Sequence, residues 1–302
     1  MNGSFEKRLV SLEEKRLLTF AKNKKLSSCS SFRIGGPVDY AVYPKCAEGA
    51  EALIAAAKEE NEPLSVIGGG SNILFPDEGV RGAILFTSLL DEVKIDGERV
   101  RAGAGVPLSV LTGKAQKAGL TGIEFLYGIP GSVGGAVYMN AGAYEHSISE
   151  ALTESVYYDI ENEKTGRMSL EEHDYAYRHS AYMGKKALIL EAEFCLQKDD
   201  PAAIKARMDD YMQRRKSKQP LEYPSAGSVF KRYPGYFTGK LIEDSGLKGY
   251  TVGGAQVSTK HAGFIVNIGG ATAEDVKKLV AHIEQVIFEN YGIHIERELI
   301  YF

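Results

Sequence analysis

Short glycine clusters, each directly after an apolar run, are the feature that most constrains how this chain folds. Residues 68–72 read Gly-Gly-Gly-Ser-Asn after the apolar run 64–67, and residues 128–135 read Gly-Ile-Pro-Gly-Ser-Val-Gly-Gly. Glycine accounts for 33 of 302 residues, about 11 % against a typical ~7 %. Because these glycines are grouped rather than spread through a Ser/Pro-rich stretch, they indicate tight turns or close approach of the backbone to a ligand.

The first glycine cluster ends a pattern of alternating strands and helices. Residues 40–43 are typical of a strand, 47–60 of an amphipathic helix and 64–67 of a second strand, which predicts a βαβ unit with a phosphate-sized hole at its end. Residues 1–26 are predicted to form one polar, lysine-rich helix. Strand patterns follow at 83–104, 155–160 and 187–196. Helix patterns occur at 107–117, at 201–218 after Asp200 and at 273–291 after Thr272. A short helix is predicted where Ser169 and Glu172 form a capping box.

Composition excludes several classes of protein. The net charge is 36 − 40 = −4, which disfavours a nucleic-acid-binding protein. Apolar runs are far shorter than the roughly 20 residues of a membrane span, and the N-terminus does not resemble a secretory signal. The three cysteines form no CxxC pair and His146, His179 and His261 are dispersed, so we expect a reducing cytoplasm and no disulfide or metal site.

The glycine clusters do not match two common nucleotide-binding motifs. No G-x-x-x-x-G-K-[ST] occurs, and residues 103–108 begin like a dinucleotide fingerprint but lack its third glycine and contain a proline. A pyrophosphate needs several backbone N–H groups aimed at one place, which the two clusters together can supply. Hairpins and bulges explain either cluster alone, whereas the pair favours a ligand site, with side-chain donors at Ser71, Asn72 and Ser132.

Several segments together resemble the UDP-N-acetylenolpyruvoylglucosamine reductase family. The matching segments occur in the family's order between about residues 27 and 298, at 67–74, 128–135, 140–143, 175–180, 224–231, and 253–258 with 261–267. Only fifty positions separate Arg178 from Ser228, which is typical of the shorter branch of the family that lacks a substrate-covering tyrosine loop. Any one segment is weak evidence, and the set is specific.

The resemblance implies an α+β fold. It predicts an FAD-binding fold of the vanillyl-alcohol-oxidase type, made of two α+β subdomains, followed by a C-terminal α/β substrate-binding domain. The predicted bounds are an N-terminal helical segment at 1–26, an FAD-binding domain at 27–199 with subdomains of about 27–88 and 89–199, and a substrate-binding domain at 200–302.

The resemblance also implies a reaction. Family members hold FAD non-covalently, take hydride from NADPH and reduce UDP-N-acetylglucosamine enolpyruvate to UDP-N-acetylmuramate. This is a step of peptidoglycan precursor synthesis, and so of cell wall biogenesis, cell shape and cell division. We therefore expect a cytoplasmic, monomeric enzyme whose partner is the UDP-sugar and which binds neither nucleic acid nor membrane.

Site residues are carried over from the family position by position. Arg178 matches the residue that binds the substrate carboxylate, Ser228 the proton donor and Glu298 a C-terminal acid, with Glu296 left as an alternative because both face one side if the segment is a strand. The predicted substrate contacts are Tyr177, Lys218, Arg232 and Gln256. The predicted FAD-binding residues are Gly68, Gly69, Gly70, Ser71, Asn72, Gly128, Ile129, Pro130, Gly131, Ser132, Gly134, Gly135, Asn140, Ala141 and Gly142.

An independent observation fits an anionic substrate. Between Met212 and Arg232 six basic residues stand against one acid, a local charge of +5 in a chain whose total is −4. A local positive field beside Ser228 suits a diphosphate and a carboxylate. Two alternatives stay open, namely another flavin oxidoreductase or oxidase of the same fold and a non-catalytic nucleotide-binding protein.

Overall fold

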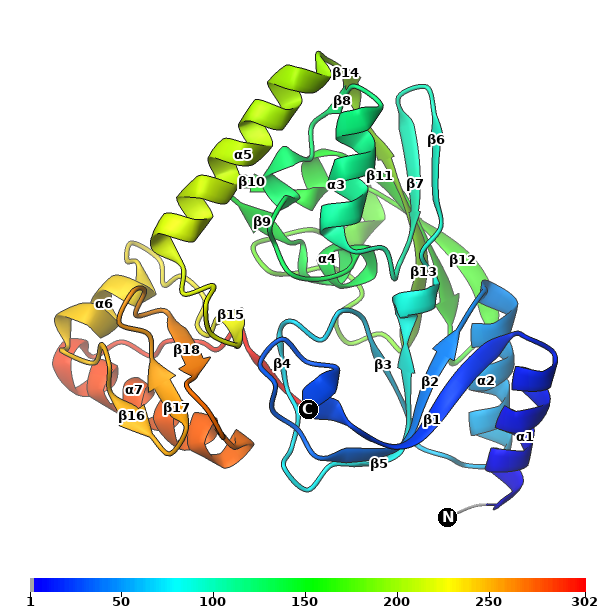
Figure 1. Cartoon of the computed structure of the whole chain (residues 1–302), viewed down its shortest axis with the longest axis horizontal. Helices are drawn as coiled ribbons and strands as arrows, with labels where there is room; N and C mark the ends of the chain where they lie inside the picture. Colours follow the sequence, from blue (N-terminus) through cyan, green and yellow to red (C-terminus); the bar gives the residue numbers. More distant parts are fainter. Residues whose placement is uncertain (1–2) are drawn as a thin grey trace. The chain divides into compact units, whose positions relative to one another are not determined.

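The computed structural model describes residues 3–302 (Figure 1). These residues form two compact units. The first unit consists of residues 3–23, 39–69 and 81–213, and the second of residues 24–38, 70–80 and 214–302. The chain therefore passes between the units inside the first glycine cluster, after Gly69. Each unit has its own apolar core and is described by itself.

The first unit begins with a four-stranded sheet that contains the predicted βαβ pattern. Its strand order is β1-β2-β5-β3, and β3 runs parallel to β5 with Leu64 opposite Ala83. The predicted helix at 47–60 is confirmed as α2, which buries Leu53, Ile54 and Ala57 beside the neighbouring α1. The bounds are α1 Gly3–Glu14, β1 Leu18–Lys25, β2 Pro37–Pro44, α2 Ala47–Glu59, β3 Leu64–Ile67 and β5 Val80–Phe86.

The single helix predicted over residues 1–26 is wrong beyond Glu14. Arg16 has a φ of 61°, a left-handed conformation that an α-helix does not continue through, and Leu18–Lys25 forms β1. This strand lies at the edge of its sheet, and edge strands commonly carry lysines that discourage pairing with another chain. The lysines that favoured a solvated helix face are therefore equally suited to an edge strand.

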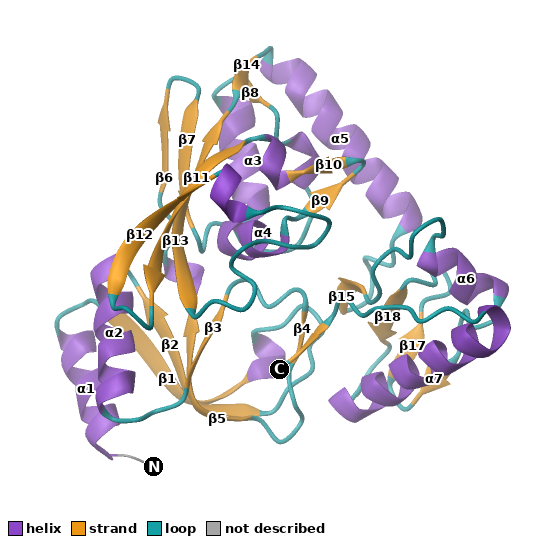
Figure 2. Ribbon diagram, turned by 180° about the vertical axis from the view of Figure 1, so that it is seen from behind, coloured by secondary structure: helices purple, strands orange, loops and turns teal. Residues whose placement is uncertain are grey.

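An antiparallel five-stranded sheet forms the rest of the first unit (Figure 2). Helices α3 (Leu108–Lys117) and α4 (Val133–Met139) share one apolar cluster with β7, β11 and β13. Leu188 and Leu190 of β13 belong to the cluster of the first sheet, so this strand contributes to both cores. The strand order is β12 (Lys164–Ser169), β11 (Leu152–Asp159), β13 (Ala187–Cys195), β7 (Arg99–Gly103) and β6 (Val93–Asp96).

Helix α5 spans Pro201–Lys218, as predicted from its N-cap. The Asp200 carboxylate accepts a hydrogen bond from the N–H of Ala203 at 3.0 Å. Arg207 of this helix pairs with Glu124 and Asp199 in the first unit, which ends at Gln213. The proposed domain boundary at residue 200 thus falls at the start of α5, and the domain bounds stay a prediction.

The second unit packs α7 (Ala273–Tyr291) with a small antiparallel sheet of order β15-β18-β17-β16. Helix α7 buries its apolar side chains at helical spacing, namely Val276, Leu279, Val280, Ile283 and Ile287. Thr272 and Asp275 form the predicted capping box, and Gly292 ends the helix at a φ of 67°. The other bounds are β15 Ser225–Ser228, α6 Thr238–Asp244, β16 Thr251–Val252, β17 Ala255–Val257 and β18 Phe264–Asn267.

Short elements complete both units. In the second unit β4 (Ile73–Leu74) pairs in parallel with β19 (Ile300–Tyr301), which joins residues 226 or more positions apart in the chain. The first unit holds two more two-stranded pairs, β9 (Gly142–Ala143) with β10 (His146–Ser147) and β8 (Leu120–Thr121) with β14 (Gln197–Lys198). Five 3-10 turns lie at Leu26–Ser28, Thr87–Leu89, Glu124–Leu126, Ile148–Glu150 and Glu171–His173.

Candidate active site

The two glycine clusters lie against each other within the first unit. A Cβ placed on Gly68 would lie 2.7 Å from the Ser132 hydroxyl oxygen, and one on Gly69 would lie 3.0 Å from the Cα of Gly131. Side chains at positions 68 and 69 would therefore clash with the second cluster and push the two clusters apart. Glycine at these positions thus brings the backbone amides of both clusters close together, as a diphosphate site requires.

Other glycines of the clusters are explained by packing alone. In the second unit Gly70 has a φ of 61°, and a Cβ there would lie 2.1 Å from the carbonyl oxygen of Cys29. In the first unit the N–H of Gly134 donates to the Ala104 carbonyl at 2.8 Å. A Cβ placed on Gly134 would lie 2.8 Å from the Cβ of Ala104. The position of these two glycines therefore reflects the fold and needs no ligand.

A buried acceptor lies beside the loop that follows α4. Asn140 ends that helix with a φ of 44°, is 6 % exposed, and donates from Nδ2 to the Ala176 carbonyl at 3.0 Å. Its Oδ1 has no hydrogen-bond partner within residues 3–302. A buried orphan acceptor is costly unless a ligand satisfies it. FAD fits this unit, because its ring systems carry N–H donors and its diphosphate suits the backbone amides that the two clusters bring together.

Arg178 occupies a strained turn that aims its guanidinium at the Asn140–Gly142 loop. The turn runs from Ala176 to His179, and Arg178 has a φ of 53°, where glycine or asparagine is the usual residue. The guanidinium donates to the carbonyls of Gly142 at 3.2 Å and Asn140 at 3.5 Å, and its Cζ lies 5.1 Å from the centre of the Tyr177 ring. Strain of this kind persists where a function over-determines the backbone.

A buried hydrogen-bond network supports the segment that carries this turn. The Ser155 hydroxyl lies 2.8 Å from Nε2 of His173 and 2.6 Å from the Tyr182 hydroxyl, while Nδ1 of His173 lies 2.6 Å from the Ser169 carbonyl oxygen. Burial lowers the pKa of His173, which keeps the imidazole neutral with Nδ1–H donating to that carbonyl. Ser180 adds a bond to the Tyr138 carbonyl at 2.6 Å.

Ser155→Ala is expected to lower the free energy of unfolding by about 1–3 kcal/mol, because it leaves His173 and Tyr182 without their shared buried partner. Denaturant unfolding followed by circular dichroism measures the change. Ser217→Ala is the matched control, since Ser217 is exposed on α5 and should change stability by no more than about 0.5 kcal/mol. Equal stability of the two variants would contradict a structural role for the network.

In the second unit Ser228 lies at the end of β15, beside a partly buried histidine. Ser228 pairs with Phe264 of β18, and a Cβ on Gly263 would lie 3.3 Å from the Ser228 hydroxyl oxygen and 3.1 Å from Nδ1 of His261. The N–H of Gly263 donates to that Nδ1 at 3.1 Å, and burial lowers the pKa of His261. The Ser228 hydroxyl and a neutral imidazole therefore both lie against Gly263, and the Ser228 hydroxyl donates to the Phe230 carbonyl at 3.5 Å.

Glu298 is held next to Ser228 through the backbone of Val229. The Val229 carbonyl accepts from the N–H groups of Glu298 at 2.8 Å and Leu299 at 3.2 Å. The Asn72 side chain donates to the Glu298 carbonyl at 3.0 Å, and the Asn72 carbonyl accepts from the N–H of Ile300 at 3.1 Å. From the sequence Asn72 was predicted only as an FAD-binding residue. In the structure its two hydrogen bonds also hold the backbone of the segment that carries Glu298.

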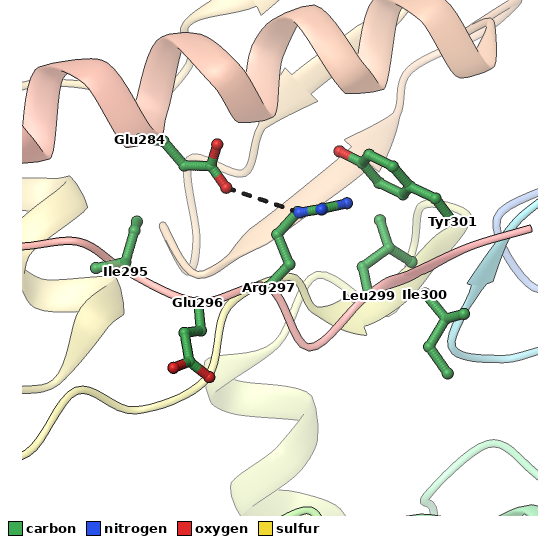
Figure 3. Close-up of a pocket in the computed structure, with 7 residues that line it drawn as sticks. All are labelled: Glu284, Ile295, Glu296, Arg297, Leu299, Ile300 and Tyr301. Carbon is green, nitrogen blue, oxygen red and sulfur yellow. Dashed lines mark ion pairs between the residues drawn. The ribbon is translucent and has the colours of Figure 1, made fainter. Parts of the chain in front are cut away.

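Glu296 has different surroundings from Glu298. Its side chain is 75 % exposed and pairs with Lys231 at 3.2 Å, whereas Glu298 is half-buried. Figure 3 shows Glu296 pointing away from Arg297, whose Nε lies 3.8 Å from Glu284 of α7 and whose Cζ lies 4.1 Å from the centre of the Tyr301 ring. These contacts lie in a pocket of about 560 Å³ lined by Glu284, Ile295, Glu296, Arg297, Leu299, Ile300 and Tyr301.

The predicted substrate contacts are divided between the units. Tyr177 is 50 % exposed in the first unit, beside Arg178. In the second unit Lys218 and Arg232 are exposed, and the Arg232 guanidinium lies 5.7 Å from the centre of the Phe237 ring. Gln256 of β17 donates from Nε2 to the Thr251 hydroxyl at 2.9 Å. Phe237 was not among the residues that the sequence singled out.

The described residues carry no cluster of three or more His, Cys, Asp or Glu side chains placed to hold a metal ion. Within residues 3–302 the longest helices, α5 and α7, are too polar to cross a bilayer, and no other helix qualifies.

Comparison with known proteins decides the family. A family model described as the C-terminal domain of UDP-N-acetylenolpyruvoylglucosamine reductase matches residues 219–302, and one described as an FAD binding domain matches residues 38–158. The UDP-N-acetylenolpyruvoylglucosamine reductase of Pediococcus pentosaceus is 46 % identical over 278 residues, which cover 92 % of each chain. That of Clostridium novyi is 45 % identical and covers 97 % of this chain and 94 % of its own. This chain belongs to the UDP-N-acetylenolpyruvoylglucosamine reductase family.

Solved structures agree with this family. The UDP-N-acetylenolpyruvylglucosamine reductase of Thermus caldophilus superposes with a TM-score of 0.80 at 31 % identity, covering 94 % of this chain and 98 % of its own. A Physcomitrella patens BBE-like 1 variant shares the fold alone, with a TM-score of 0.50 at 14 % identity over 65 % of this chain and 44 % of its own. The predicted α+β, vanillyl-alcohol-oxidase-type fold is confirmed. As a member of this reductase family, the chain is a flavin-dependent oxidoreductase of peptidoglycan precursor synthesis.

Proposed function

We propose that this chain reduces the enolpyruvyl ether of UDP-N-acetylglucosamine enolpyruvate to the lactyl ether of UDP-N-acetylmuramate, with FAD as resident cofactor and NADPH as hydride donor. The observation that carries the proposal is the identity of 43–46 % to curated reductases of this name over more than nine-tenths of the chain. The paired glycine clusters and the Ser228–Glu298 arrangement support it from the structure.

The first unit supplies the groups that would hold FAD. The two glycine clusters pack together at Gly68, Gly69, Gly131 and Ser132, and their backbone amides would bind the diphosphate, while the orphan Oδ1 of Asn140 would accept from a ring N–H. When bound, FAD supplies a hydride that originates from NADPH.

Arg178 is proposed to bind the substrate carboxylate. Hydride addition at the methylene carbon of the enolpyruvyl group leaves carbanion character on the carbon next to that carboxylate, and a positive partner stabilises this charge as it develops. A guanidinium suits the role because its planar fork matches a carboxylate and stays charged throughout. The two loop carbonyls that Arg178 contacts fix its orientation in advance.

Ser228 is proposed to donate the proton that completes the reaction. Its O–H bond breaks as a C–H bond forms at the carbanionic carbon, and the resulting alkoxide regains a proton from solvent. A serine is a weak acid, so the alkoxide needs hydrogen-bonding neighbours. His261 is proposed as such a neighbour, because its imidazole lies against the same Gly263 as the Ser228 hydroxyl, and a neutral ring whose Nδ1 accepts from Gly263 carries its proton on Nε2.

Glu298 is proposed to donate a hydrogen bond to the developing enolate as a protonated acid. Glu298→Ala is expected to lower kcat by roughly 100-fold, the effect of removing one donor aimed at developing charge. Glu296→Ala is the control and should change kcat less than about threefold, because Glu296 forms an exposed ion pair. Steady-state kinetics of both variants decides between the two acids, and a larger loss in Glu296→Ala would reverse the assignment.

The setting in which the enzyme works is also a proposal. We propose a cytoplasmic monomer that binds its UDP-sugar and neither nucleic acid nor membrane. The three cysteines, Cys29, Cys46 and Cys195, form no CxxC pair, which supports a reducing compartment, and the net charge of −4 argues against a nucleic-acid partner.

The test of the proposed function is substrate-dependent oxidation of NADPH by FAD-loaded protein. NADPH loss should be slow with the cofactors alone and should rise steeply when UDP-N-acetylglucosamine enolpyruvate is added. If NADPH loss does not depend on the UDP-sugar and is accompanied by peroxide formation, the protein is instead an oxidase of the same fold.

A further inference from the structure

A tight turn with exposed aromatic rings lies in the second unit. Its central residues, Pro234 and Gly235, follow Ser228 by six and seven positions. Residues 232–237, here called the aromatic turn, read Arg-Tyr-Pro-Gly-Tyr-Phe. The N–H of Tyr236 donates to the Tyr233 carbonyl at 2.9 Å, and Gly235 has a φ of 80°. Pro and Gly at the centre define a type II turn, so the backbone is rigid for a surface loop.

The rings of the aromatic turn are unusually exposed. Phe237 is 70 % exposed, the largest value among the large apolar side chains of residues 3–302, and Tyr236 is 53 % exposed. Tyr233 packs partly on the core, with its ring centre 6.1 Å from that of Tyr236. The Arg232 guanidinium lies 5.7 Å from the centre of the Phe237 ring. A cation and two exposed rings thus share one short, anchored turn.

The base of the aromatic turn is tied to the Ser228 site by direct contacts. On one side, the N–H of Lys231 donates to the Glu296 carbonyl at 2.8 Å, and the Thr238 hydroxyl donates to the Lys231 carbonyl at 2.6 Å. On the other side, a Cβ on Gly239 would lie 3.2 Å from the backbone nitrogen of Gly263, the glycine that flanks Ser228.

These contacts bound how far Phe237 lies from Ser228. Phe237 is two residues from Gly239, a reach of at most about 7 Å along the backbone. The aromatic turn therefore begins and ends close to the segments that carry Ser228 and Gly263.

We propose that the aromatic turn binds the nucleotide end of the substrate, with Phe237 stacking on the uracil ring beside Arg232, which the family resemblance already predicts as a substrate contact. The proposal rests on the proposed function. The substrate that this function implies has a uracil at one end, an enolpyruvyl group at the other and a diphosphate between them. Stacking on an aromatic side chain is the general way in which proteins hold a base. The charge of +5 between residues 212 and 232 favours the diphosphate on the same side.

Phe237→Ala is expected to raise KM for the UDP-sugar about tenfold, equivalent to about 1.4 kcal/mol, and to change kcat less than about twofold. Phe237→Tyr keeps a flat ring and should restore KM. Phe288→Ala is the matched control, because it removes another exposed phenyl ring of the second unit, on α7 and stacked on His294, and should leave KM unchanged. Unchanged KM in Phe237→Ala, or a fall in kcat alone, overturns the proposal.

Binding of UDP alone separates this proposal from the proposed function. Titration calorimetry with UDP should give a Kd about tenfold higher for Phe237→Ala than for the wild type and for Phe288→Ala. Equal Kd values overturn the aromatic-turn proposal even if the wild type reduces the UDP-sugar. A wild type that binds UDP through Phe237 but oxidises no NADPH with the UDP-sugar refutes the proposed function and leaves the aromatic-turn proposal supported.

Discussion

Ser228→Ala is expected to slow reduction of the UDP-sugar by roughly 1,000-fold, within the range of about 10²–10⁴ typical for loss of a positioned acid. Removing the hydroxyl leaves the carbanionic carbon without its proposed proton donor. Reduction of bound FAD by NADPH should proceed at the wild-type rate, since that step needs no proton from Ser228. Stopped-flow absorbance of the flavin measures both steps separately.

Ser225→Ala is the control for this variant, because Ser225 lies on the same strand and its backbone pairs with Val266. It should retain most of the wild-type turnover. A Ser228→Ala enzyme that turns over at the wild-type rate would remove Ser228 from the mechanism. Loss of both half-reactions together would indicate damage to the fold instead of loss of a proton donor.

Gly69→Ala is expected to weaken FAD binding by roughly 100-fold, the equivalent of one or two hydrogen bonds to a charged group at about 1.5–3 kcal/mol each. The backbone of Gly69 is open to alanine, because its φ is outside the left-handed region. The added methyl would, however, lie 3.0 Å from the Cα of Gly131 and 3.2 Å from the backbone nitrogen of Ser132. The clusters must then separate, and amides aimed at the diphosphate lose their alignment.

The ratio of flavin to protein absorbance after purification, followed by titration with FAD, measures this effect. Gly113→Ala is the matched control, since Gly113 lies within α3 with nothing within 4 Å of the added methyl. This control should keep full FAD occupancy and gain about 0.5–1 kcal/mol of stability from helix propensity. Full FAD occupancy in Gly69→Ala would contradict the cradle.

Helices α5 and α7 and their ends were predictable from local sequence. Their predicted N-cap residues, Asp200 and Thr272, precede the first residue of each helix, and both helices have the predicted bounds. The segment 15–26 was not predictable in the same way, because its lysines suit an edge strand as well as a helix face. Pairing of this segment with β2 decides in favour of the strand. Because β2 begins only at Pro37, a pattern read within residues 15–26 cannot reveal this pairing.

The glycine clusters show how far local pattern reaches at the site. Grouping predicted tight turns or close approach of the backbone to a ligand. The structure shows Gly68 and Gly69 packed against Gly131 and Ser132, and approach to a ligand stays a prediction. The pattern did not indicate which segment each glycine packs against, such as Cys29 for Gly70 and Ala104 for Gly134. Asn72 illustrates the same limit, because its bond to the Glu298 backbone joins residues 226 positions apart.

The choice between Glu296 and Glu298 required the structure. A strand period of two predicts that both side chains face one side, but β19 begins only at Ile300, so that period does not apply at these positions. Glu296 extends into solvent towards Lys231, and Glu298 is fixed between Val229 and Asn72. Catalytic use of Glu298 remains a proposal for the alanine variants to test.

Anaerobic transfer of reducing equivalents tests the central claim most directly. Protein loaded with FAD is first bleached with one equivalent of NADPH in the absence of oxygen, and UDP-N-acetylglucosamine enolpyruvate is then added. We expect the yellow absorbance to return as the sugar is reduced, with one UDP-N-acetylmuramate formed for each flavin. Flavin that stays bleached after the UDP-sugar is added would contradict the account.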